Sequence, residues 1–371
     1  MIRLVEPQIG EEEFRAVREV LSTGMLIQGK RVAEFEAVLA EFMGATQVLA
    51  VSSGTAALHL ALAALGIGPG DAVFVPAFTF PATANVVELQ RARPVFVDVD
   101  PETYCITEAT LREAIRTWAG PERPRAVMPV HEFGAPCPMD DIMSVAREFG
   151  LVVIEDAACA LGTVYHGRHV GTLGEIGCFS WHPRKAITTG EGGAVVTQDA
   201  KLHDRVSLLR NHGMQRNGDG MVDFVAPGFN YRMTEFQAVL GTSQLRRFEQ
   251  ALAARRSLAV LYRCELSGVP GLRLPADIPG HSWQTFMIVL PEGVRRKAVI
   301  AHLHSNGIES NLGAQALHLL SYYGEKYGYY RQQYPVAAEL YERGLALPIH
   351  GALSQKSGAF IAAAIKEAMM G

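Results

Sequence analysis

The sequence has no long run of charge of a single sign. Its 34 Lys and Arg residues and 38 Asp and Glu residues are scattered over 371 residues and leave a formal net charge of −4. Nucleic-acid-binding proteins usually concentrate basic residues in one patch, so we expect no nucleic-acid partner. Disorder requires low hydrophobicity, and the 49% hydrophobic content excludes it. A chain of this length predicts about two domains with well-buried cores.

Cysteines are few and membrane-like segments are missing. The five cysteines are odd in number and form no Cys-x-x-Cys pair, which argues against a disulfide framework and a zinc site. The N-terminus, MIRLVEPQIGEEEF, lacks the apolar core of a secretory signal. The least charged long stretch, residues 47–70, is interrupted by polar residues, whereas a membrane span needs about 20 consecutive apolar ones. We expect a soluble, cytoplasmic protein with no metal and no membrane partner.

Short apolar runs alternate with helical patterns over the first 230 residues. Helix candidates lie at residues 11–21, 32–42, 56–65, 82–89, 108–117 and 139–149. Apolar strand candidates lie at residues 48–51, 72–76, 94–98, 126–130, 151–154, 177–181 and 194–197. Strands that alternate with helices predict an α/β domain with a largely parallel sheet.

The pattern changes after about residue 233. Residues 234–266 predict one long helix, with Thr234 as its N-cap and Glu235 in its first turn. Further strand and helix candidates follow at residues 284–290, 294–305 and 361–369. We predict a large domain over residues 1–245, whose first dozen residues pack with a smaller α+β domain over residues 246–371.

Two nucleotide-binding motifs are missing. Residues 24–31, GMLIQGKR, approach the phosphate-loop pattern, but Arg31 stands where Ser or Thr should hold magnesium, and a helix precedes them instead of a strand. No Gly-x-Gly-x-x-Gly is present, which removes the main support for a nicotinamide-binding fold. Nucleotide hydrolysis and hydride transfer are therefore disfavoured.

Two segments combine a predicted strand end with residues suited to ligand binding. Residues 52–55, SSGT, lie between a strand and a helix, where free N–H groups and the helix dipole bind anions; an ordinary N-cap is the alternative. Glu155 and Asp156 end a predicted parallel strand, where a carboxylate points into the ligand crevice; an N-cap is again the alternative.

The most specific segment is residues 182–193, HPRKAITTGEGG, between two predicted strands. Its glycines allow a tight reversal beside Lys185. Burial there would lower the pKa of Lys185 and make it an amine nucleophile; the alternative is a solvated loop lysine. An anion site, a crevice carboxylate and a sequestered lysine are together what pyridoxal phosphate (PLP) requires.

A set of motifs from about Pro7 to His350 resembles the DegT/DnrJ-type sugar aminotransferases, which share the fold of aspartate aminotransferase (fold type I). The motifs are SGTAAL (53–58), PAFTF (76–80), PVH (129–131), EDAA (155–158), SWHPRK (180–185), GEGG (190–193), GFNYRM (228–233) and LP (347–348). The resemblance implies a large α/β domain with a mostly parallel seven-stranded sheet flanked by helices, plus a smaller α+β C-terminal domain. It also implies a PLP-dependent aminotransferase with active sites at a homodimer interface.

The resemblance also assigns roles to single residues. Lys185 would bond to the cofactor and move the proton, Asp156 would pair with the ring nitrogen, and Phe80, ahead of Phe78, would stack on the ring. The phosphate would be held by Gly54, Thr55, Ser180 and, from the other subunit, Asn230. The substrate-lining candidates are His131, His182, Arg232 and His318; a satisfied structural role is the alternative for a lone histidine.

One position departs from the family pattern. Relatives usually have Gln or His where this chain has Cys159, and that side chain hydrogen-bonds the ring hydroxyl. A thiol is a weak donor. Either another group such as a water takes this role, or the cofactor's electronics differ, and we expect Cys159 to line the cofactor without being catalytic.

The resemblance implies L-glutamate as amino donor and a nucleotide-linked keto-deoxysugar as acceptor. Residues 310–318, SNLGAQALH, lack the proline-rich stretch of relatives that aminate carbon 3, which favours a 4-keto-6-deoxyhexose. A sugar 3-dehydratase has His in place of the lysine, and Lys185 disfavours it. A scyllo-inosose-type aminocyclitol aminotransferase stays open. A non-catalytic PLP-binding regulator or scaffold would have lost Lys185 or Asp156.

Overall fold

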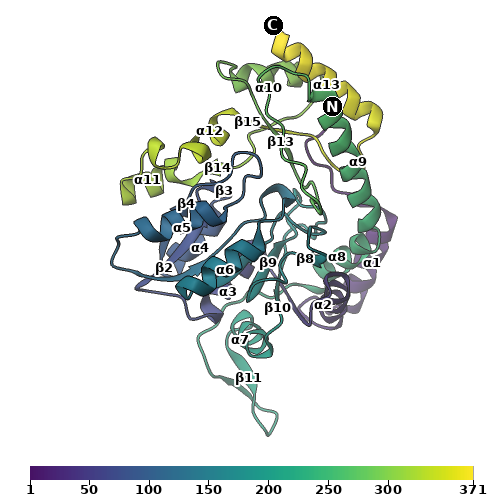
Figure 1. The fold of residues 1–371 in the computed structure, drawn as a ribbon. Coiled ribbons are helices and arrows are strands. Elements are labelled where there is room, and N and C mark those ends of the chain that lie inside the picture. The colour runs from purple at the N-terminus through teal and green to yellow at the C-terminus, as the bar shows by residue number, and fades with distance from the viewer. Residues whose placement is uncertain (371) are drawn as a thin grey trace.

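A seven-stranded sheet forms the centre of the molecule (Figure 1). The computed structural model describes residues 1–370, so Gly371, the last residue of the predicted second domain, lies outside it. The strands follow the order β1 (Gln47–Val51), β10 (Gly193–Thr197), β9 (Ile176–Ser180), β6 (Val152–Asp156), β5 (Arg123–Val127), β2 (Asp71–Pro76) and β4 (Arg93–Val97). Strand β10 runs in the direction opposite to the other six strands of this sheet. The predicted α/β class with a mostly parallel sheet is confirmed.

Helices cover both faces of this sheet, as the apolar character of its strands requires. In β1, Leu49 and Val51 join the core shared with α3, whereas Val48 and Ala50 join a second core shared with α2. The covering helices are α2 (Lys30–Met43), α3 (Gly54–Ala64), α4 (Ala82–Leu89), α5 (Glu108–Thr117), α6 (Met139–Phe149) and α7 (Ala200–Arg210). Helix α7 was not among the predicted elements; its N-cap, Asp199, accepts the N–H groups of Lys201 and Leu202.

A third core lies in the C-terminal part of the chain, at the top of Figure 1. It is built from α9 (Phe248–Leu266), α10 (Arg296–Ser305), α13 (Gln355–Met370) and the antiparallel pair β13 (Phe286–Val289) and β15 (Gly344–Leu347). The N-terminal segment reaches this part, because Ile2 pairs with Ile308. Each helix described within residues 1–370 is too short or too polar to span a bilayer.

The segment between β13 and β15 returns to the large sheet. Its strand β14 (Gln315–Ala316) pairs with β3 (Phe78–Thr79), and the 3-10 turn η2 (Leu317–Leu319) follows directly. Tyr323 of α11 (Ser321–Tyr327) and Leu340 of α12 (Pro335–Arg343) pack into the main core, with the short turn η3 (Arg331–Gln333) between the two helices. Residues distant in sequence therefore meet beside β3.

The predicted single helix over residues 234–266 is wrong. Two helices, α8 (Glu235–Arg246) and α9, meet at Arg247, whose φ of −111° and ψ of 9° are not helical. The break lets Phe248 turn into the second core, where it packs edge-on against Phe42. Arginine has good helix propensity, so the break cannot be predicted from the local sequence.

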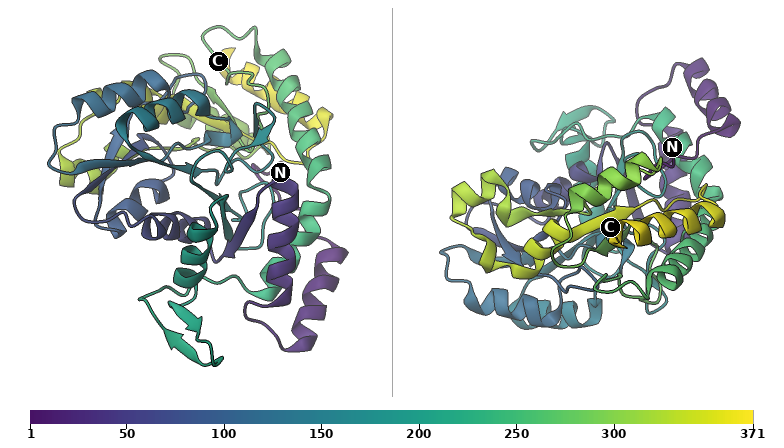
Figure 2. Two further views of the ribbon diagram at one scale, coloured as in Figure 1. Left: turned by 60° about the horizontal axis from the view of Figure 1, so that its bottom comes forward. Right: turned by 90° about the horizontal axis from the view of Figure 1, so that it is seen from above.

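Two parts of the chain stand out from the body (Figure 2). One is a hairpin of β11 (Met214–Arg216) and β12 (Val222–Phe224), and the other is α1 (Glu11–Thr23). The hairpin exposes large apolar side chains, among them Met221 at 67% and Phe224 at 62%. A second, smaller hairpin joins β7 (Val164–Tyr165) to β8 (Arg168–His169).

The loop that approached the phosphate-loop pattern already holds an anion of its own. The buried carboxylate of Glu235 accepts the backbone N–H groups of Gly29, Arg31 and Val32 at 2.9–3.0 Å. These are the free N–H groups at the start of α2, which any helix must satisfy. The loop is therefore a helix cap and offers no free phosphate site.

We predict that Glu235→Ala lowers the free energy of unfolding by about 3 kcal/mol, because three N–H groups lose a charged acceptor. Urea denaturation checks this, with Glu249→Ala as control, since Glu249 is an exposed first-turn glutamate of the next helix. Equal stability of the two variants would contradict the capping role.

Candidate active site

Asp156 lies at the carboxyl end of β6 with a side chain that is almost fully buried. Its Oδ2 accepts the hydroxyl of Thr83 at 2.8 Å, and its Oδ1 accepts the N–H of Ala158 at 3.1 Å. Burial raises the pKa of Asp156, although both donors oppose this rise. The carboxylate is thus held in place by two neutral donors, with no basic side chain paired to it at hydrogen-bond distance among the described residues.

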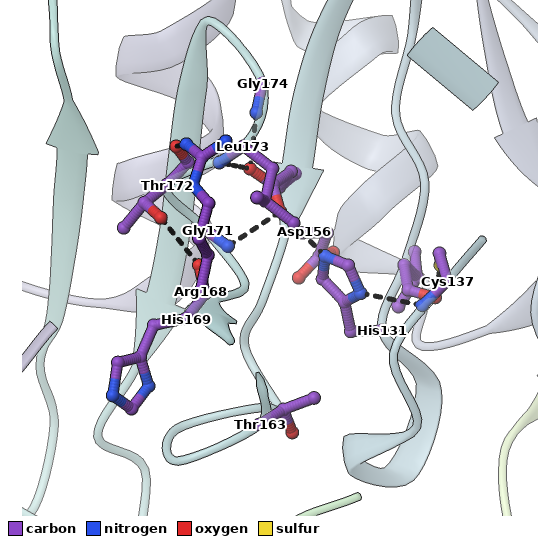
Figure 3. A network of polar contacts seen from close by, with 12 residues as sticks. His131, Cys137, Asp156, Thr163, Arg168, His169, Gly171, Thr172, Leu173 and Gly174 are labelled. Atoms are coloured by element: carbon purple, nitrogen blue, oxygen red, sulfur yellow. Dashed lines mark hydrogen bonds and ion pairs between the residues drawn. The ribbon is translucent and has the colours of Figure 1, made fainter. Parts of the chain in front are cut away.

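The adjacent Glu155 serves the opposite face of β6. Its Oε2 accepts from His131 Nε2 at 2.9 Å and from a backbone N–H, and Oε1 accepts two more; these N–H groups belong to Gly171, Leu173 and Gly174. Figure 3 shows the loop of residues 171–174 beside Asp156. Burial would raise the pKa of Glu155, but His131 and the N–H groups outweigh it and lower it.

His131 is fully buried and uses both ring nitrogens. Its Nδ1 accepts the N–H of Cys137 at 3.1 Å, so the ring proton sits on Nε2 and is donated to Glu155. The backbone N–H of His131 also donates to the carbonyl of Asp156. This geometry supports the strand end under Asp156 and leaves His131 no free nitrogen for a substrate.

The anion site predicted at residues 52–55 lies between the start of α3 and the end of β9. The first intrahelical hydrogen bond of α3 runs from Ala57 to Ser53, so the N–H groups of Gly54 and Thr55 precede it. A Cβ on Gly54 would stand 2.7 Å from Cβ and 3.0 Å from Oγ of Ser180. Glycine is therefore required where the helix meets Ser180, and the two form one site.

The Lys185 loop connects β9 to β10 and is fixed from two sides. The Gln244 side chain exchanges two hydrogen bonds with the backbone of Thr188, and the Gln284 amide donates to the carbonyl of Arg184 at 2.7 Å. Lys185 Nζ lies 3.0 Å from Cys159 Sγ. The lysine is therefore sequestered and lies among groups from β6 and the segment after it.

The expectation that burial lowers the pKa of Lys185 is wrong for the cofactor-free chain. Burial does act in that direction, but the Cys159 sulfur and the carboxylates of Asp156 and Glu132 outweigh it and raise the pKa. The sequence could not reveal this, because Cys159, Asp156 and Glu132 lie 26 to 53 residues away along the chain. Lys185 stays an ammonium until a ligand changes this surrounding charge.

Glu132 is a buried carboxyl group of the candidate site that the sequence did not point to. It is 4% exposed and belongs to the 3-10 turn η1 (Glu132–Gly134). The next residue, Phe133, has a φ of +56°, unusual outside glycine, and its carbonyl accepts the N–H groups of Gln284 and Thr285. Burial raises the pKa of Glu132 to about 7, although Thr79 and Lys185 act against it.

The remaining predicted residues lie in different surroundings. Phe80 is 66% exposed just before α4, whereas Phe78 is buried against Tyr104 and Phe133. The exposed ring is the one free to meet a ligand. Asn230 is exposed on a segment whose next residue, Tyr231, accepts the N–H of Ser52.

The other substrate candidates are only partly free. Arg232 donates to the Asn211 side chain at 2.6 Å, and its backbone pairs with Val51 next to the anion site. His182 is half-buried in the Lys185 loop, where burial lowers its pKa. His318 is fully buried in η2, and burial lowers its pKa to about 4, so it is neutral at physiological pH.

Gly54, Asp156 and Lys185 converge at one edge of the sheet. β1, β6 and β9 are parallel, so their carboxyl ends meet there, and Asp156 pairs with Cys178, two residues before Ser180. The predicted anion site, Asp156 and Lys185 therefore lie at the edge where open α/β sheets bind ligands in a crevice. This set fits PLP: the close contact of Gly54 with Ser180 leaves backbone N–H groups for the phosphate, and Asp156 and Lys185 match the ring nitrogen and the aldehyde.

Comparisons with known proteins agree with this chemistry. The family model described as the DegT/DnrJ/EryC1/StrS aminotransferase family matches residues 7–366. The chain is 36% identical over 382 residues to the spore coat polysaccharide biosynthesis protein SpsC of Bacillus subtilis, with 98% of this chain and 96% of SpsC covered.

Solved structures give the same picture. The aminotransferase TlmJ from Streptoalloteichus hindustanus has a TM-score of 0.91 at 35% identity and covers 100% of this chain and 99% of its own. Helicobacter pylori PseC, an aminotransferase involved in the biosynthesis of pseudoaminic acid, has a TM-score of 0.92 at 28% identity, with 99% and 98% covered. Similar solved structures include the PLP form and the pyridoxamine phosphate (PMP) form of the sugar aminotransferase Spr1654 from Streptococcus pneumoniae.

We predict that Gly54→Ala weakens PLP binding at least about tenfold, because the added Cβ pushes Ser180 away from the phosphate-binding N–H groups. Spectroscopic titration of cofactor-free protein with PLP measures this. Gly68→Ala is the control, since a Cβ there meets its nearest neighbour at an ordinary 3.6 Å. Unchanged affinity in Gly54→Ala would show that the phosphate binds elsewhere.

Proposed function

The chain belongs to the DegT/DnrJ/EryC1/StrS aminotransferase family and is a PLP-dependent sugar aminotransferase, and on this premise we propose that it transfers the amino group of L-glutamate to a nucleotide-linked 4-keto-6-deoxyhexose. The observation that carries the proposal is the convergence of Lys185, Asp156 and the Gly54–Ser180 site at one sheet edge. The product would be an amino sugar for glycan or secondary-metabolite biosynthesis.

Each residue in the crevice has a role that its surroundings support. Bound PLP supplies an aldehyde carbon and an electron-accepting ring. Asp156, held by Thr83 and Ala158, would keep the ring nitrogen protonated. Lys185, once it is an uncharged amine, would take the proton from the donor's α-carbon.

The phosphate and the ring face would be held by other residues. The N–H groups of Gly54 and Thr55 and the hydroxyl of Ser180 would bind the phosphate at the start of α3. The exposed ring of Phe80 would stack on the cofactor, and Cys159 would lie beside Lys185 without entering the chemistry.

The choice of acceptor is supported by the position of residues 310–318. This stretch contains β14, which pairs with β3 immediately before Phe80. It therefore borders the proposed ring-stacking residue, where an acceptor sugar would bind. The absence of proline in this stretch favours amination at carbon 4.

A homodimer completes the proposal. Asn230 is exposed in the single chain, and large apolar side chains are exposed at Met25, Ile27 and Phe80 and on the β11–β12 hairpin. Exposed large apolar side chains that are close together in the chain, as on the hairpin and at Met25 and Ile27, favour an interaction surface. Asn230 would reach the phosphate of the neighbouring subunit, and a monomer with full activity would contradict that role.

We expect the purified protein to be yellow with PLP and to be bleached by L-glutamate as the pyridoxamine form accumulates. Lys185→Ala should slow this half-reaction by roughly 10²-fold or more, since it removes the proton-transferring amine. Stopped-flow absorbance measures the rate, and Lys201→Ala, which changes an exposed lysine, should match the wild type. Full speed in Lys185→Ala would refute the catalytic assignment.

A panel of dTDP-, UDP- and GDP-linked 3-keto and 4-keto sugars identifies the acceptor. We expect the pyridoxamine form to be reoxidised fastest by a 4-keto-6-deoxy sugar, with the yellow colour returning. Faster turnover of a 3-keto sugar would overturn the carbon-4 assignment. Amination of scyllo-inosose alone would favour the aminocyclitol reading.

A further inference from the structure

The crevice contains a second buried carboxyl group that the proposed mechanism leaves unused. Glu132 lies between His131, whose N–H donates to the carbonyl of Asp156, and Gly134, whose added Cβ would meet the carbonyl oxygen of Cys159 at 3.2 Å. Its side chain is 4% exposed. The titratable groups that interact with it electrostatically are Lys185, Asp156, Cys159 and Cys137.

The two carboxyl groups differ in how they are hydrogen-bonded. Both oxygens of Asp156 accept donors, from Thr83 and Ala158. In Glu132, by contrast, Oε2 is buried and has no hydrogen-bond partner among the described residues. Donors that point at a carboxylate favour its charged form, and a buried oxygen without one disfavours it. If only one of the two can stay ionised, Asp156 will be that one.

Whether one of these two carboxyl groups must be protonated depends on the charge of Lys185. While Lys185 is an ammonium, it compensates a nearby carboxylate. Once its amine is uncharged, two carboxylates in one buried crevice repel each other and one must take a proton. Glu132, the group with the unpartnered oxygen, belongs to the turn that packs against Cys159, and the Cys159 sulfur lies 3.0 Å from Lys185 Nζ. Glu132 can therefore accept that proton without any charge entering or leaving the crevice.

We propose that Glu132 is a positioning residue for Lys185 that stores the proton Lys185 gives up when it becomes a neutral amine. One N–H bond of the ammonium breaks and leaves its electron pair on Nζ, and an O–H bond forms on Oε2 of Glu132. The pair changes from ammonium and carboxylate to amine and carboxylic acid, and Asp156 stays ionised for the ring nitrogen. This inference rests on the roles proposed above for Lys185 and Asp156.

A group that stores a proton in this way must titrate near neutral pH, and the pKa of Glu132 in the cofactor-free chain agrees with this. Burial raises its pKa to about 7, while the Thr79 hydroxyl and the Lys185 charge lower it. The proton is therefore available near neutral pH. Removing either opposing group should move the titration to higher pH.

The test uses the full-length cofactor-free protein labelled with ¹³C at the glutamate side-chain carboxyl. One resonance should titrate with a midpoint near pH 7 and be absent from Glu132→Gln and Glu132→Asp. Glu292→Gln, which changes an exposed glutamate, should leave it in place. Lys185→Ala should raise the midpoint by about one unit, and Thr79→Val should also raise it.

The outcomes separate this proposal from the proposed function. A midpoint at the ordinary glutamate value of roughly 4.3, or one unmoved by Lys185→Ala, overturns proton storage whatever the enzyme aminates. In PLP-loaded Glu132→Gln, the pH dependence of the cofactor's visible absorbance should shift while the protein still binds PLP; an identical pH profile overturns the proposal. If no sugar is aminated but the resonance behaves as expected, the acceptor assignment fails and the Glu132–Lys185 pair remains.

Discussion

The structure depends on two adjacent carboxylates at the end of one buried strand. Glu155 and Asp156 both leave water, and each needs donors where the sheet supplies few. Because side chains alternate along a strand, the two point to opposite faces. Glu155 is fully saturated by His131 and the 171–174 loop, so it fixes the strand end. Asp156 is held only by two neutral donors, which leaves it open to a cationic ligand.

The sheet topology brings the other groups to this carboxylate. Lys185 follows Asp156 by 29 residues, but β9 runs parallel to β6 and ends at the same edge of the sheet, and Lys185 lies in the loop that follows β9. Ser180 ends β9 and meets the start of α3, which follows β1 on the far side of β10. The anion site is therefore built from two strands separated by a third, and the tight fit of Gly54 keeps it closed.

Much of this could be predicted from sequence because the signals are local. The apolar runs locate all seven sheet strands, and the strand-to-helix junction at residues 52–55 marks the proposed anion site. The predictions that were wrong concern features that depend on contacts between residues distant in the sequence. The break at Arg247 follows from burial of Phe248, and the raised pKa of Lys185 follows from acidic groups brought near by folding. Glu132 has no motif; the positive φ of Phe133, stabilised by Gln284 and Thr285, accompanies its buried position and is invisible in one sequence.

The cap that Glu235 forms on α2 has a consequence beyond that helix. The backbone N–H of Glu235 also donates to the carbonyl of Leu26, so the loop before α2 is tied to α8 through both side chain and backbone. That loop holds Met25, Leu26 and Ile27 with 40–65% of each side chain in solvent. The backbone of this loop is therefore already ordered in the isolated chain. A surface that docks against these three side chains would meet them pre-ordered, and the loss of freedom that usually opposes association would be correspondingly small.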